Sequence, residues 1–109
     1  MIRKMFISLL LIVVCVNVNA DAQSDRKKFI DQLISQGIFK KVDVVDNVPY
    51  AWATPVFKSL DFQTKTNCLS VVYGYYITEN PDYDVLVIVD STTGSPLGEY
   101  KKTGGLKLQ

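Results

Sequence analysis

The longest uninterrupted aliphatic run after the N-terminal segment is Val85–Val89. It is too short for an independent helix and lacks the alternation of a strand with one solvent-exposed face. The run therefore predicts a central strand that protein covers on both faces. Residues Ser91–Pro96 concentrate Ser, Thr, Gly and Pro, which reverse a chain, so that Leu97–Lys102 can return beside the run. These segments together predict a β-hairpin.

A helical pattern lies between Ser24 and Gly37. Its apolar residues recur on one side of a helix: Phe29, Ile30, Leu33 and Ile34. Charged residues occupy the opposite side, so the segment predicts an amphipathic helix that packs on the core. Ser24 is suited to cap the first turn, and Gly37 is suited to end the helix in a left-handed conformation.

Two short strands are expected next. Ile38–Val45 places valines among charged residues, which is typical of a strand near the edge of a sheet. Asp46–Pro49 is a turn signal. Residues Tyr50–Ala53 then alternate large and small side chains, which puts Tyr50 and Trp52 on the same face of a strand.

The segment from Asp61 to Thr78 has conflicting signals. Asp61 is a good helix cap, and four apolar side chains share one side of a helical wheel: Phe62, Leu69, Tyr73 and Tyr76. The strand-forming residues around Gly74 argue instead for a strand. We choose a helix over about residues 62–77. Its other side carries Cys68, Val71 and Tyr75, which predicts a helix that is buried nearly all round.

These elements predict a small α+β domain over residues 21–109, in the order α-β-β-α-β-β, with two helices packed on one mainly antiparallel sheet. Gly104 and Gly105 allow a bend, after which Leu106–Leu108 can form a last short strand. A chain of this length supports one domain with a modest core.

The N-terminal segment reads as a secretory signal peptide. Arg3 and Lys4 precede the apolar run Phe6–Val16, and small residues follow. We expect cleavage after Ala20, with Ala22 as the alternative. Residues 1–20 are therefore excluded from the fold, and the mature protein is expected to be periplasmic or secreted. A run of this length rises only about 16 Å as a helix, which is about half of a hydrocarbon core, so no stable membrane insertion is expected after cleavage.

Charge and cysteine content narrow the choice of partners. Removing residues 1–20 leaves ten Lys or Arg and eleven Asp or Glu, a net charge of −1. A nearly neutral domain has no field that gathers nucleic acid, so we expect no nucleic-acid partner. Cys68 then has no partner for an internal disulfide. We expect it to be a small buried residue; an intermolecular bridge or a reactive thiol remain alternatives.

Catalytic and metal-binding groups are scarce. Histidine is absent, which removes the commonest general base and the commonest metal ligand. We expect no metal, no cofactor and no enzymatic activity. Two pairs of acids remain for a carboxylate-dependent hydrolase, Asp43 with Asp46 and Asp82 with Asp84, but each flanks a turn or a strand end where acids serve solubility and capping.

Aromatic residues are the remaining feature. Tyr and Trp combine a large apolar surface with a polar tip and are frequent at binding hot spots, although they are also ordinary core residues. The candidate binding residues are Tyr50, Trp52 and Phe57. The sequence favours an exported, non-enzymatic binding module of a bacterial envelope, which recognises another envelope or extracellular protein in an accessory, inhibitory or immunity-like role. The alternative is a carbohydrate or cell-wall binder that uses the same aromatic residues.

Overall fold

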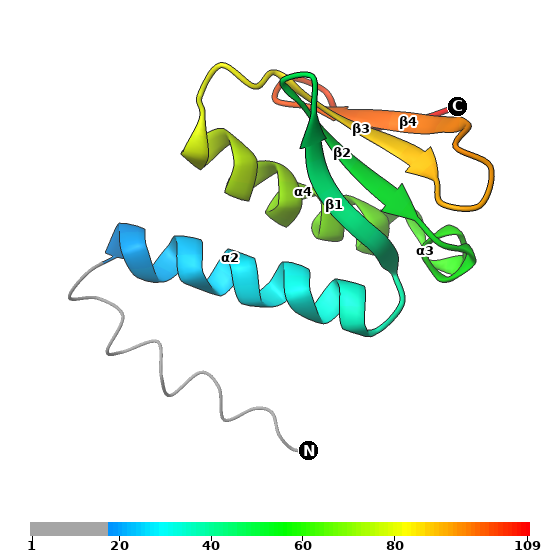
Figure 1. The fold of residues 1–109 in the computed structure, drawn as a ribbon, viewed down its shortest axis with the longest axis horizontal. Helices are drawn as coiled ribbons and strands as arrows, with labels where there is room; N and C mark the ends of the chain where they lie inside the picture. Colours follow the sequence, from blue (N-terminus) through cyan, green and yellow to red (C-terminus); the bar gives the residue numbers. More distant parts are fainter. Residues whose placement is uncertain (1–17) are drawn as a thin grey trace.

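A computed structural model describes residues 18–109 as a five-stranded sheet with its helices on one side (Figure 1). The elements in order are α2 (Val18–Ser35), β1 (Phe39–Val45), β2 (Val48–Ala53), α3 (Pro55–Ser59), α4 (Phe62–Glu79), β3 (Val85–Asp90), β4 (Pro96–Lys101) and β5 (Gly105–Leu108). The cleavage sites that we expect fall at or near the start of α2, and residues 1–17 of the expected signal peptide lie outside the described residues.

The strands follow one another across the sheet in the order β1-β2-β3-β4-β5. Neighbouring strands are antiparallel except β2 and β3, which are parallel. Helices α3 and α4 form the crossover between them and return the chain to the end of the sheet at which β2 begins. The predicted α+β class and mainly antiparallel sheet are confirmed. The element order differs, because the short helix α3 precedes α4 and β5 completes the sheet.

Helix α2 ends as the sequence predicts and begins earlier than it predicts. Gly37 has a φ of +80°, the Gly37 amide donates to the Ile34 carbonyl at 3.0 Å, and the Ile38 amide donates to the Leu33 carbonyl at 2.9 Å. These paired bonds are a Schellman ending, which turns the chain directly into β1. The helix starts at Val18, so Ser24 lies inside it and is not the N-cap. Alanines before Ser24 favour this extension.

The β1–β2 hairpin turns through Asp46 and Asn47, whose φ values are +52° and +64°. Two consecutive left-handed residues make the type I′ turn that matches strand twist, and it pairs Val45 with Val48. The prediction that β1 is an edge strand is confirmed.

Helix α4 resolves the conflict over residues 61–78 in favour of a helix. The Asp61 carboxylate accepts a hydrogen bond from the Thr64 amide at 2.7 Å and caps the first turn. The side that packs on the core buries Cys68, Leu69, Val72 and Tyr73. Burial all round is wrong: Phe62, in the first turn of α4, is 57% exposed, and Val71 and Tyr75 are only half-buried although α2 packs against this helix.

Strand β3 is the middle strand of the sheet, as predicted, but its two faces differ. Leu86 and Ile88 are fully buried beneath the helices. Val85 and Val87 point to the other face and are half-buried. The prediction that protein covers both faces is therefore wrong, because the described helices pack on one side only (Figure 1).

Candidate functional site

The sheet face away from the helices is the first candidate surface; we call it the open face. Side chains alternate along each strand, so the residues between the buried ones point to this face. They are Lys41, Asp43 and Val45 on β1, Val48, Tyr50 and Trp52 on β2, Val85, Val87 and Val89 on β3, Glu99 and Lys101 on β4, and Lys107 on β5; of these, Val89 is buried, at 6% exposure. The open face thus has an aromatic and aliphatic centre with charged residues toward both edges.

Tyr50 and Trp52 form the centre of the open face, on the same side of β2 as predicted. Their rings stack with centroids 5.7 Å apart and planes inclined by 30°. Both side chains are half-buried. The Lys41 ammonium lies 4.3 Å from the centroid of the Trp52 ring, a cation–π contact between register partners of β1 and β2. These contacts hold the two rings in a fixed arrangement.

Phe57 does not belong to this surface. It is 1% exposed and packs in the core, with its ring centroid 5.3 Å from that of Phe39. Thr54 directs it there, because the Thr54 hydroxyl accepts hydrogen bonds from the Val56 and Phe57 amides and so caps α3. Phe57 is therefore wrong as a candidate binding residue: Thr54 followed by Pro55 signals the start of a short helix, which the predicted elements do not include.

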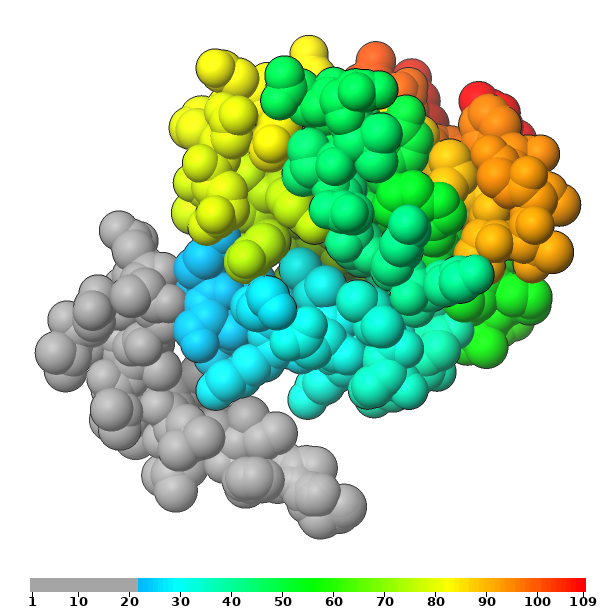
Figure 2. Space-filling model, in the orientation of Figure 1, coloured from blue at the N-terminus to red at the C-terminus, as the bar shows by residue number. Residues whose placement is uncertain are grey.

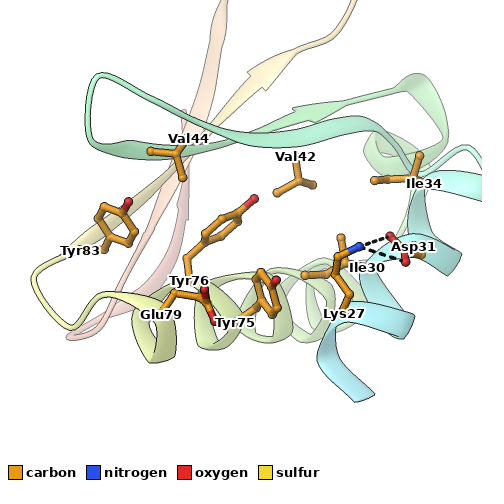
Figure 3. A pocket seen from close by; sticks show the side chains of 10 residues that line it. All are labelled: Lys27, Ile30, Asp31, Ile34, Val42, Val44, Tyr75, Tyr76, Glu79 and Tyr83. Carbon is orange, nitrogen blue, oxygen red and sulfur yellow. Dashed lines mark hydrogen bonds and ion pairs between the residues drawn. The ribbon is translucent and has the colours of Figure 1, made fainter. Parts of the chain in front are cut away.

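A groove between α2, the C-terminal half of α4 and β1 is the second candidate surface (Figure 3). Its cavity volume is about 330 Å³. The lining residues are Lys27, Ile30, Asp31, Ile34, Val42, Val44, Tyr75, Tyr76, Glu79 and Tyr83. Figure 2 shows the surface hollowed where these elements meet, beside the edge strand. We call it the β1 groove.

The tyrosines of the β1 groove form a connected row. Tyr76 meets Tyr75 edge to face at a centroid distance of 5.4 Å and Tyr83 at 6.4 Å. Burial raises the pKa of Tyr76 to about 12, and the nearby Asp43 carboxylate adds to the rise. Tyr76 thus stays a neutral phenol well above physiological pH, and its hydroxyl is able to donate a hydrogen bond.

The charged side chains of the β1 groove lie at its rim. The Lys27 ammonium pairs with Asp31 at 3.3 Å, one turn further along α2. The Glu79 carboxylate accepts a hydrogen bond from the Gln23 side chain at 3.1 Å. Because Lys27 is paired, Glu79 gives the rim an excess of negative charge.

Two titratable groups outside both surfaces, Asp90 and Cys68, belong to the framework of the fold. Asp90, 7% exposed, accepts hydrogen bonds from the Thr92 and Thr93 amides at 2.7 and 3.2 Å and pairs with Lys58, so it holds the β3–β4 turn. These contacts, the Lys58 bond foremost, lower the pKa of Asp90. Cys68 is buried as predicted, and burial raises the pKa of its thiol.

The acids considered for hydrolysis are exposed; among them, Asp84 lines a cavity, together with Val85, Glu99, Lys101, Lys102 and Thr103. Asp46 occupies the β1–β2 turn, Asp82 and Asp84 lie exposed before β3, and Asp43 accepts a hydrogen bond from the Val44 amide at 2.8 Å. Within residues 18–109, no three side chains of the His, Cys, Asp or Glu type lie close enough to hold a metal ion. The same part of the chain has no helix with the length and apolar character needed to cross a bilayer.

Comparison with known proteins adds no family. No protein-family model matches the chain, and no curated protein and no solved structure is significantly similar to it.

Proposed function

We propose that this protein is an exported, non-enzymatic binding module that recognises another envelope or extracellular protein through its open face. The observation that carries the proposal is the stacked pair Tyr50 and Trp52 at the centre of a sheet face that no helix of residues 18–109 covers. Large aromatic side chains held in one arrangement lose little entropy on binding, and this is why they dominate protein–protein hot spots.

The arrangement of the rings favours a protein over a carbohydrate. A sugar stacks on a free aromatic face, whereas Trp52 already uses ring faces for Tyr50 and for the Lys41 ammonium. Lys41, Asp43 and Glu99 surround the pair with charges of both signs. A polar rim around an apolar centre is the usual anatomy of a protein interface.

Export is part of the proposal. Cleavage after Ala20 or Ala22 would retain Gln23, whose side chain donates to the Tyr75 carbonyl at 2.8 Å and anchors α2 to α4. It would also retain Arg26, whose guanidinium lies against Gly74. The mature chain would thus keep the contacts that hold α2 on the domain, and it would be released as a periplasmic or secreted protein.

Capture of partners from an envelope extract tests the proposal. We expect wild-type protein to retain a specific partner, and Trp52→Ala and Tyr50→Ala to weaken that retention by about thirtyfold, which corresponds to a hot-spot loss of about 2 kcal/mol. Val56→Ala is the matched control, because Val56 is an exposed apolar residue on α3, away from the open face. Cell-wall sacculi are assayed in parallel; retention on sacculi that depends on Trp52 would support the carbohydrate alternative instead.

A further inference from the structure

The outer edge of β1 can add another strand. In a hairpin with a two-residue turn, the pair that flanks the turn exchanges hydrogen bonds, and the pairs alternate from there. Val45 and Val48 flank the turn, so Asp43 bonds to Tyr50 in the same way. Val44 lies between these two pairs and Val42 lies just beyond the second, so the backbone groups of both point away from β2.

One hydrogen bond shows this outward direction independently. The Val44 amide donates to the Asp43 carboxylate at 2.8 Å rather than to a carbonyl of β2. A short acidic side chain that covers an edge amide is a common protection against uncontrolled strand pairing. The same amide becomes available when the carboxylate turns away.

The β1 groove lies directly beside this edge, since Val42 and Val44 belong to both (Figure 3). A strand added along β1 would direct every second side chain to the helix side of the sheet, toward Ile30 and Ile34. The cavity volume of about 330 Å³ is at the lower end of the range of about 300–1,000 Å³ for ligand sites. It therefore suits one or two side chains of a peptide better than a large compact ligand.

The charged side chains near the β1 groove favour a peptide with a positive charge. Glu79 lines the groove, and the Asp43 carboxylate lies at the outer edge of β1, where it accepts the hydrogen bond from the Val44 amide. Lys27, which could oppose them, is paired with Asp31. A basic side chain next to the inserted apolar one would gain from both carboxylates.

We propose that β1 and the β1 groove bind an extended peptide segment of a partner protein by strand addition, with an apolar side chain in the groove and a Lys or Arg beside it. The backbone of the segment bonds to Val42 and Val44, and its carbonyl replaces the Asp43 carboxylate on the Val44 amide. This is a second site, on the edge of the sheet, and it does not depend on the function of the open face. Strand addition with alternate side chains in pockets is an established mode of peptide recognition.

The probe is the peptide acetyl-TKTLTKT-amide, which reads the same in both directions and so presents Lys, Leu and Lys to the groove whichever way it binds. Titration into the ¹⁵N-labelled protein is expected to shift the amide signals of Val42 and Val44 and to slow their hydrogen exchange. A peptide that is N-methylated at the residues facing β1 is expected to bind about tenfold more weakly or worse, because it loses two or more net hydrogen bonds. The acidic analogue acetyl-TETLTET-amide is expected to be weaker by about fivefold or more.

Two protein variants separate this site from the open face. Val44→Pro removes an outward amide that β2 does not use, and we expect it to weaken peptide binding by about fivefold or more while the sheet is kept. Trp52→Ala is expected to leave peptide binding unchanged, since Trp52 lies on the opposite face of the sheet. Loss of peptide binding in Trp52→Ala alone would move the site to the open face and overturn the proposal.

Three other results would also overturn it. Equal binding of the N-methylated and unmodified peptides would show that strand addition is not the mode, and this comparison does not depend on the folding of any variant. No shift at Val42 and Val44 at millimolar peptide would remove the site. Slow exchange of these amides without peptide, together with a dimer in solution, would show that a second copy of the chain occupies the edge.

Discussion

Trp52 and Phe57 lie close together in the sequence, and the fold gives them opposite environments. Phe57 is enclosed against Phe39, whereas Trp52 is half-buried on the open face. We expect Phe57→Ala to lower the free energy of unfolding by about 3–5 kcal/mol, the cost of a cavity in a core. Trp52→Ala should cost about 1–2 kcal/mol, from the lost stacking and cation–π contacts. Urea denaturation measures both, and an equal large loss would place Trp52 in the core.

Cys68 offers a second test of burial at the scale of one residue. Its thiol is 4% exposed, and burial raises its pKa, so little reactive thiolate is accessible in the folded protein. We expect alkylation by a thiol reagent to be at least about a hundredfold slower in the native protein than in urea, because it requires opening of α4. Rapid native labelling, or a dimer that reductant dissociates, would contradict this.

Asp90 makes the free energy of unfolding depend on pH in the acid range. Its folded pKa lies below the ordinary value of 3.8, so the ionised carboxylate stabilises the fold at pH values above 3.8, and this contribution is lost as the pH falls through the folded pKa. We expect the free energy of unfolding to fall below about pH 4, and the difference between wild type and Asp90→Asn to shrink over the same range. Urea melts at a series of pH values measure it; a constant difference would show that the charge of Asp90 does not matter.

At the scale of the element, β3 distinguishes the two faces of the sheet. Ile88→Lys places a charge beneath the helices, where burial without a partner costs several kcal/mol, and we expect the domain not to fold. Val87→Lys is the matched variant one position away. It points to the open face opposite Glu99, and we expect a change of less than about 1 kcal/mol. Thermal unfolding checks both, and failure of both would show that the open face is covered.

A glycine on β4 is required by the close approach of β5. Gly98 on β4 approaches β5 so closely that a Cβ atom there would lie 2.3 Å from the Lys107 carbonyl oxygen. No side chain fits, because the obstacle is backbone rather than a flexible side chain. A glycine at this position therefore allows β5 to join the sheet, as Gly104 and Gly105 allow the turn before it.

At the scale of the molecule, the predicted cleavage of the signal peptide sets the N-terminus of the mature chain. The order of positive residues, apolar run and small residues predicts cleavage after Ala20 or Ala22, which leaves the contact of Gln23 with the Tyr75 carbonyl intact. Intact-mass measurement of protein recovered from the periplasm or medium checks it, with an N-terminus expected at Asp21 or Gln23. Protein that retains Met1 and sediments with membranes would show an anchor instead.

The two proposed surfaces occupy different parts of one sheet. The open face carries the aromatic pair that we propose for a folded partner, whereas the β1 groove lies at the edge, where we propose that an extended segment binds. Because β1 contributes Lys41 to the first surface and Val42 to the second, a single partner could contact both around the edge strand.

Local rules in the sequence determined most of the elements. The stop at Gly37, the cap at Asp61, the turn at Asp46 and the alternation through Tyr50 and Trp52 each depend on residues close in the chain, and the structure has all four. The α+β class follows from their order. The helix predicted over about residues 62–77 is also confirmed, as α4 (Phe62–Glu79), because capping and the apolar side outweigh strand propensity.

Tertiary structure alone decided burial. The run Val85–Val89 looks the same whether one face of the sheet is covered or two, so its pattern could not show that the second face is open. In the sequence, Phe57 looks like an apolar residue of a loop. In the structure, Thr54 caps the short helix α3, and this helix directs the Phe57 side chain into the core. The β1 groove gathers side chains from α2, α4 and β1 that are far apart in the sequence, and only the packing of the helices on one face brings them together.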